Sequence, residues 1–153
     1  MHENFKKALS EYVLAERHFQ KTRDQNGLLL CYLGLMEQNR ILAKWDAVRE
    51  YEKLSDELRD SFNPARATLA HFYNRKAAIA SEVDHDNDQA IQLSLKAINY
   101  AMETNDTFTM ASSYNQIAFG YGTQNKFQQA HHYYQRSLEL YKKIGNERYV
   151  VDL

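Results

Sequence analysis

The residues with the most evident chemical potential form an acidic run, DHDND, at residues 84–88. Its carboxylates alternate along the chain, as the first ligands of a calcium-binding loop do. The pattern then fails, because Gln89 stands where such a loop needs a glycine and Leu95 stands where it needs a bidentate glutamate. We interpret the run as a solvated turn whose acids favour the positive N-terminus of the next helix.

The region around this run has an acidic bias. Between residues 77 and 125 the only base is Lys96, whereas acids stand at Glu82, Asp84, Asp86, Asp88, Glu103 and Asp106. Attraction of a basic partner is one interpretation of this bias, and a plain solvated face is the other. We favour the solvated face.

The histidines do not form a metal site at the spacing the sequence gives them. His131 and His132 are adjacent, so on a helix their side chains diverge by about 100° and cannot grip one ion together. The other histidines have no histidine or cysteine at ligand spacing; they are His2, His18, His71 and His85. The sequence therefore predicts no metal ligands.

Residues for covalent or phosphate chemistry are also lacking. Cys31 lies in the apolar run LLLCYLGLM, which predicts a buried thiol without a histidine to activate it. The five glycines form no phosphate-binding loop, and Glu50 and Glu52 lie among lysines and arginines, which suits solvent better than acid–base work. We expect neither a catalytic residue nor a cofactor, and hence no enzyme.

The net charge and the hydropathy of the sequence limit the classes of partner that we expect the chain to bind. Lysine plus arginine (19) nearly balances aspartate plus glutamate (20), so no basic field attracts nucleic acid. No apolar run approaches the roughly 18 residues of a membrane span, and the N-terminus MHENFKKALSEYV lacks a secretory signal. We expect a cytoplasmic chain that binds neither nucleic acid nor membrane.

The elements that must position any site are helices. One proline, five glycines and no alternating Val, Ile and Thr favour an all-α fold. Asn63 before Pro64 predicts a cap and a first helical residue, Asp106 predicts another cap, and Gly145 predicts a helix end. The expected helices cover residues 3–22, 26–42, 45–60, 64–82, 87–104, 107–122 and 127–143, with another beginning near 147.

Two of these helices repeat one another. KFQQAHHYYQRSLEL at residues 126–140 aligns with KWDAVREYEKLSDEL at residues 44–58. The same register pairs Tyr32 with Tyr114, Leu35 with Ile117, Met36 with Ala118, Trp45 with Phe127, Tyr51 with Tyr133, Ser55 with Ser137 and Leu58 with Leu140. A small residue recurs at positions 8, 48, 90 and 130, where two crossing helices need close approach. The period of about 40 residues is typical of a helical-hairpin solenoid.

The third copy carries a family signature. SYNQIAFGYGTQNKFQQAHHYYQRSLEL places Tyr114, Ile117, Ala118, Tyr121, Ala130, Tyr134 and Ser137 at the spacing of the tetratricopeptide repeat. The chain therefore resembles that family, in a long form with a period of about 40 residues. The resemblance implies an α-solenoid of antiparallel helical hairpins, wound as a right-handed superhelix.

We expect one repeat domain over residues 1–153. Its parts are a half repeat (1–24), repeats at 25–62, 63–104 and 105–145, and the start of another at 146–153. Because both ends cut through a hairpin, we expect a segment of a longer protein. The first helix would then offer Leu9, Tyr12, Val13 and Phe19, together with Phe5, to no neighbour on one side, which predicts self-association through the end helices.

The resemblance also implies where a ligand binds, since the first helix of each hairpin lines a concave groove in this family. Carried over by register, the groove positions are Leu33, Glu37 and Arg40, then Arg75, Ile79 and Glu82, then Asn115, Phe119 and Gly122. Arg40, Arg75 and Asn115 suit a peptide backbone or carboxylate, and Phe119 suits an apolar contact. The pattern does not match the clamp for chaperone tails.

These observations predict a non-catalytic module that binds a protein or peptide in the groove. We expect it to be the sensing or docking segment of a larger bacterial signalling or regulatory protein, since long-period repeats with GNE and ND junctions resemble those beside such effectors and both ends cut through a hairpin. Binding would shift a conformational population. The alternative is a standalone scaffold that assembles partners without an effector.

Overall fold

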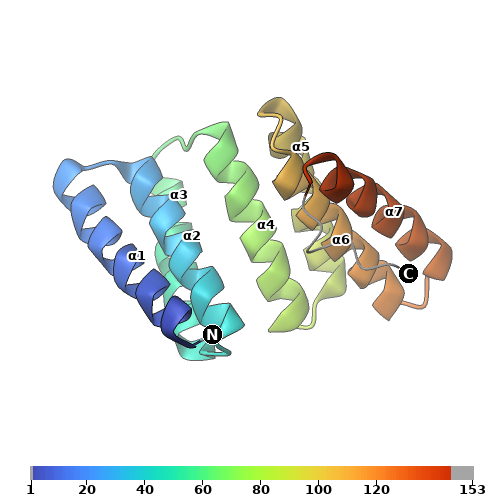
Figure 1. The fold of residues 1–153 in the computed structure, drawn as a ribbon, viewed down its shortest axis with the longest axis horizontal. Helices are drawn as coiled ribbons and strands as arrows, with labels where there is room; N and C mark the ends of the chain where they lie inside the picture. The colour runs from blue at the N-terminus through green and yellow to red at the C-terminus, as the bar shows by residue number, and fades with distance from the viewer. Residues whose placement is uncertain (1, 146–153) are drawn as a thin grey trace. The chain divides into compact units, whose positions relative to one another are not determined.

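A computed structural model describes residues 2–145 of the chain, with side chains from residue 7 onward (Figure 1). The described residues form seven α-helices joined by short turns, with no strand among them. By their contacts they divide into two compact units, residues 1–68 and 69–153, and the boundary falls inside the fourth helix. Within the described residues, no helix is long and apolar enough to cross a membrane.

The first unit holds helices α1 (His2–Thr22), α2 (Gln25–Ile41) and α3 (Trp45–Ser61), and each packs on the next (Figure 1). Two glycines of α2 permit the close contact with α1, because a side chain at Gly34 would collide with the ring of Tyr12 and one at Gly27 with the ring of Phe19. The expectation that α1 offers Tyr12 and Phe19 to no neighbour is therefore wrong. Val13 of α1 is exposed.

The second unit holds most of α4 (Arg66–Glu82), then α5 (Asn87–Glu103), α6 (Thr107–Thr123) and α7 (Phe127–Lys143). Helix α6 packs on both α5 and α7. Its Ile117 is fully buried with two isoleucines of α5, and three half-buried tyrosines cover this cluster. The cluster and its cover consist of Ile91, Ile98, Ile117, Tyr114, Tyr121 and Tyr133.

Most of the described helices end in turns with the same backbone conformation. A residue in the left-handed region follows all but one of them; these residues are Arg23, Ala43, His85, Asn105, Asn125 and Gly145. The next amide then bonds back to the helix, as Lys126 N does to Tyr121 O (2.9 Å) and Asp106 N does to Ala101 O (2.9 Å). As a result α5, α6 and α7 begin at residues 87, 107 and 127, which are 20 residues apart.

The expected helices 1 to 7 are all present, and their ends differ by at most two residues from the prediction. Asp106 is confirmed as a cap, since its Oδ1 accepts from Thr109 N (3.0 Å), and Gly145 has a φ of 65° after α7. The assignment at Asn63 and Pro64 is wrong, because α4 begins only at Arg66. The helix predicted near residue 147 lies outside the described residues.

The start of α4 takes its support from a different source. The amide of Ala65 donates to Oδ1 of Asn26 (2.9 Å), at the start of α2. The acceptor for the Ala65 amide is thus a side chain 39 residues away, whereas the local sequence predicts that Asn63 is the acceptor. Such a cap cannot be read from the residues beside the helix.

The small-residue positions are confirmed as packing positions where the described side chains allow a comparison. Val48, Ala90 and Ala130 are buried, each in the first turn of its helix, and Ala8 is half-buried. A side chain added at Gly122 of α6 would reach Ala130 of α7 at 4.0 Å. These residues set the distance between helices and are not available to a ligand.

We predict that Asp86→Ala lowers the free energy of unfolding by about 1 kcal/mol, because Oδ1 of Asp86 caps α5 by accepting from Gln89 N (2.9 Å). Lys126→Ala is the matched control, since Lys126 stands at the same position of α7 without a side-chain cap bond. Urea unfolding of both variants measures the difference. Equal loss in the two variants would contradict the assigned cap.

Candidate functional site

The acidic run at residues 84–88 serves the turn between α4 and α5. Asp86 caps α5, and Oδ1 of Asp88 accepts from Nε2 of Gln124 (2.8 Å), which follows α6. Two of the run's carboxylates therefore already act within the fold. Across the part of the chain that the structure describes, no group of three or more His, Cys, Asp or Glu is placed to hold a metal ion.

Cys31 is a packing residue. Its side chain is buried between α1 and α2, and Sγ donates to the carbonyl of Tyr12 (3.0 Å). Burial, with a smaller contribution from the charge of Glu16, raises the pKa of the thiol to about 11. The thiol is protonated at neutral pH and is a poor nucleophile.

A buried polar network joins α4, α5 and α6. Nδ2 of the buried Asn74 donates to Oγ of Ser113 (2.9 Å) and of Ser112 (3.3 Å) on α6. Nε2 of Gln116 donates to the carbonyl of Asn74 (3.3 Å), and its Oε1 accepts from Oγ of Ser94 on α5 (3.1 Å). These bonds fix α6 beside α4 in one register, because a slip would leave buried polar groups unpaired.

His71 of α4 lies beside the start of α6. Its Nε2 is 3.5 Å from Oδ2 of Asp106, and its Nδ1 is 3.4 Å from Oγ1 of Thr109. Burial is the main cause that lowers the pKa of His71; the charge of Arg75 lowers it further, and Asp106 opposes the shift.

The order Asp, His, Thr has the residue types of a hydrolytic triad, but the geometry does not support one. The Thr109 side chain is only 1% exposed, so no substrate reaches its hydroxyl. Oδ1 of Asp106 also accepts a hydrogen bond from the amide of Thr109, as the cap of α6. We interpret the three residues as a structural contact between α4 and α6.

A partly exposed stripe runs along α6. Ser112 contacts Asn74 of α4, whereas Phe108, at one end, packs edge-on against Tyr141 of α7. Phe108, Ser112, Asn115 and Phe119 recur every three or four residues and therefore share one side of the helix. Phe119 is 49% exposed and Phe108 is 39% exposed, which is unusual for large apolar side chains at this spacing. We call this stripe, together with His71 and Arg75 of α4, the α4–α6 face.

The groove residues expected from the sequence differ in their burial. Leu33 is 2% exposed and Ile79 is fully buried, so both belong to the core and we remove them from the candidate site. Asn115 and Phe119 are exposed on α6, Arg75 is half-buried near His71, and Gly122 packs by α7. Glu82 is exposed at the end of α4.

Glu37 and Arg40 of α2 bind each other. Nε of Arg40 lies 2.8 Å from Oε2 of Glu37, and its Nη2 donates to Oε1 (3.0 Å). This two-point contact holds both side chains in place and satisfies the charges that the sequence assigned to a ligand. The α4–α6 face is thus the part of the expected groove with exposed apolar surface.

Sequence reasoning missed Ser112 and His71. A serine on a helix has no distinctive pattern, although the spacing of Ser112 from Asn115 and Phe119 places it in the stripe. The spacing of His71 from other histidines and cysteines gives no signal, because its contacts are with residues 35 and 38 positions further along the chain.

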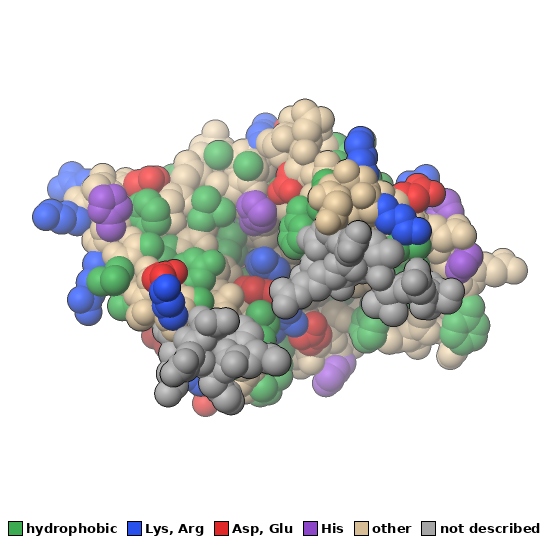
Figure 2. All heavy atoms as spheres, viewed as in Figure 1, with side chains coloured by type: hydrophobic (Ala, Val, Ile, Leu, Met, Phe, Trp, Pro, Cys, Tyr) green, Lys and Arg blue, Asp and Glu red, His purple; other side chains and the backbone are tan. Residues whose placement is uncertain are grey.

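Charge on the visible surface is mixed. Figure 2 shows Lys and Arg side chains interspersed with Asp and Glu and separated by apolar groups, without a broad patch of one sign among the described residues on that face.

Residues 66–143 match the sequence pattern of the family described as Tetratricopeptide repeat. The match runs from the first residue of α4 to the last of α7 and covers slightly more than half of the chain. The chain matches no curated protein.

We predict that Cys31 reacts with a disulfide reagent at pH 8 about 100-fold more slowly in the folded protein than after unfolding in guanidinium, because the raised pKa removes most of the thiolate. Absorbance of the released thiolate of Ellman's reagent measures both rates. Equal rates in the two states would show that the thiol is exposed and ionised.

We predict that His71 makes stability depend on pH. Because its folded pKa lies below the ordinary value of 6.5, the unfolded chain takes up the proton first, and stability falls as the pH falls below about 6.5. His71→Gln should flatten the dependence of the urea midpoint between about pH 7 and 5. His131→Gln, which changes an exposed histidine of α7, is the control. An unchanged slope in His71→Gln would refute the assignment.

Proposed function

Because this chain belongs to the tetratricopeptide repeat family, whose repeats mediate protein–protein interactions and are not catalytic, we propose that its α4–α6 face binds an extended peptide segment of a partner protein. The observation that carries the proposal is the exposure of Phe119 beside Asn115 on a helix held rigidly against α4.

Each part of the face has a role in this proposal. The ring of Phe119 offers apolar area that a partner side chain can cover. The amide of Asn115 has both donors and an acceptor, which suits a peptide backbone. Ser112, whose hydroxyl accepts from Asn74, lies between Asn115 and Phe108 along the stripe.

The length of the stripe sets the size of the ligand. From residue 108 to residue 119, α6 rises about 16 Å at ~1.5 Å per residue. An extended peptide covers that distance with about five residues. The buried Asn74 network keeps the face in one shape before binding, which lowers the entropy lost on association.

We further propose that binding serves a larger bacterial signalling or regulatory protein, in which this segment senses or docks the partner. The support is the resemblance of the GNE and ND junctions to those of long-period repeats beside such effectors. Reading the native coding sequence on both sides of this segment tests it. A kinase, cyclase or DNA-binding region nearby is the expected result, and a gene without any effector would favour a standalone scaffold.

We predict that Phe119→Asp weakens binding of a peptide selected from a displayed random library by at least about tenfold, or ~1.4 kcal/mol, because it removes the apolar anchor. Asn115→Ala should weaken the same peptide by a smaller factor. Fluorescence anisotropy of the labelled peptide measures the affinities.

The control for this experiment is Phe127→Asp. Phe127 is 67% exposed at the start of α7 and does not belong to the α4–α6 face, so this variant should bind as the unmodified chain does. Circular dichroism checks that each variant remains helical. Selected peptides that bind Phe119→Asp normally but lose affinity for Phe127→Asp would place the site on α7 instead.

A further inference from the structure

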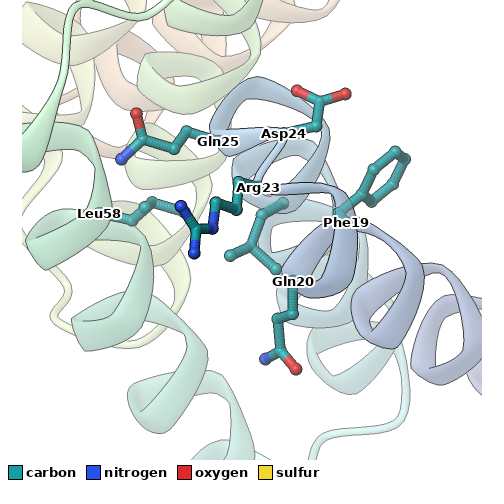
Figure 3. Close-up of a pocket in the computed structure, with 7 residues that line it drawn as sticks. Phe19, Gln20, Arg23, Asp24, Gln25 and Leu58 are labelled. Carbon is teal, nitrogen blue, oxygen red and sulfur yellow. The ribbon is translucent and has the colours of Figure 1, made fainter.

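A pocket in the first unit lies where α1 turns into α2. It has a volume of about 520 Å³. Three lining residues come from the end of α1 and the turn, three from the start of α2 and its cap, and one from α3; they are Phe19, Gln20, Arg23, Asp24, Gln25, Leu28 and Leu58 (Figure 3). The volume is within the range of small-ligand sites, roughly 300–1,000 Å³. None of these residues belongs to the α4–α6 face.

The frame of the pocket is fixed by the turn. Arg23 adopts a left-handed conformation (φ 58°), Asp24 N bonds to the carbonyl of Phe19 (3.1 Å), and Oδ1 of Asp24 accepts from Gly27 N (2.9 Å). Other helix ends also have a residue in the left-handed conformation, so the backbone conformation of Arg23 is a common feature of these turns. Its side chain is what distinguishes this turn, since the other positions hold Ala43, His85, Asn105, Asn125 and Gly145.

The guanidinium of Arg23 faces the pocket. In Figure 3 it extends toward Leu58, whereas the amide of Gln20 points away from it. Nε2 of Gln20 donates to Oε1 of Glu16 (3.2 Å). Within the described residues, the Arg23 side chain makes no hydrogen bond or ion pair. The carboxylate of Asp24 points away from it and is engaged as the cap of α2 (Figure 3).

The lining therefore combines one available cation with aliphatic walls. Arginine presents parallel N–H donors that match the two oxygens of a carboxylate. Leu28 and Leu58 supply apolar surface, which a compact inorganic anion would leave uncovered. The negative charge of Asp24 close by also disfavours a ligand with more than one negative charge.

We propose that this pocket binds a carboxylate carried on a short branched aliphatic group. Arg23 holds the carboxylate, Gln25 offers a further hydrogen bond, and Leu28 and Leu58 cover the aliphatic group. Both a free aliphatic acid and the C-terminal residue of a peptide ending in leucine have this chemistry. The proposal does not depend on peptide binding by the α4–α6 face.

The test is a titration of the ¹⁵N-labelled chain followed by amide chemical shifts. The probes are 4-methylpentanoate, its amide 4-methylpentanamide, which lacks the charge, and acetate, which lacks the aliphatic group. We expect saturable shifts with 4-methylpentanoate at the amides of residues 19–28 and near Leu58, with a millimolar dissociation constant. Each of the other two probes should bind at least about tenfold more weakly.

N-acetyl-leucine distinguishes the two sources of the carboxylate. Tighter binding of N-acetyl-leucine than of 4-methylpentanoate supports the proposal with a peptide end as the ligand, and the reverse order supports it with a free acid. Equal shifts from the amide and the acid would overturn the proposal, as would the absence of saturable shifts at these residues.

Arg23→Gln is the decisive variant, because glutamine keeps the left-handed turn at a similar cost but removes the guanidinium. It should reduce affinity for 4-methylpentanoate at least about tenfold. Arg17→Gln removes an exposed arginine of α1 that does not line the pocket and should leave binding unchanged. Normal binding by Arg23→Gln would overturn the assignment.

Discussion

The rest of the structure depends on how each helix is stopped. In five of the turns, a residue in the left-handed region lets the following amide bond back to a carbonyl five or six positions earlier, so the chain reverses within a few residues. Asparagine at 105 and 125 and glycine at 145 adopt that conformation at little cost, whereas Arg23 and Ala43 adopt it against their preference. In the second unit these stops set the interval of 20 residues at which equivalent side chains return to equivalent positions.

Regular spacing decides which residues are scaffold and which are free to act. The first turns of α3, α5 and α7 place Val48, Ala90 and Ala130 in the core. On α6 the same geometry leaves one side exposed, and Asn115 and Phe119 lie on that side. The buried amide of Asn74 holds α6 in register with α4, so a structural bond determines the shape of the proposed binding face.

Much of the fold follows from the sequence because its signals are local and repeated. Helix ends were predicted from caps and turn residues such as Asp106 and Gly145, and the repeat was found from aligned aromatic and small residues. The prediction failed at Asn63 and Pro64, because the stabilising partner of the following residue, Asn26, is far away in the sequence. A hydrogen-bond partner supplied from another helix, far away in the sequence, has no signature beside the helix that it supports.

The candidate site was harder to predict for a related reason. Register makes Leu33 equivalent to Asn115 and Ile79 equivalent to Phe119, but it gives no measure of burial, and Leu33 and Ile79 are core residues. Ion pairing between candidate site residues is equally difficult to predict. Glu37 and Arg40 are charged residues at groove positions, and the structure shows that they bind each other. The pocket beside Arg23 depends on Leu58, which is 35 positions away, so no sequence pattern indicates it.

We propose that this repeat module receives a peptide on its α4–α6 face. A crystal structure of the chain with a library-selected peptide is the most direct test. We expect an extended segment of about five residues lying along α6, with an apolar side chain on the ring of Phe119 and a backbone group bonded to Asn115. A peptide bound elsewhere, with Phe119 still open to solvent, would contradict it.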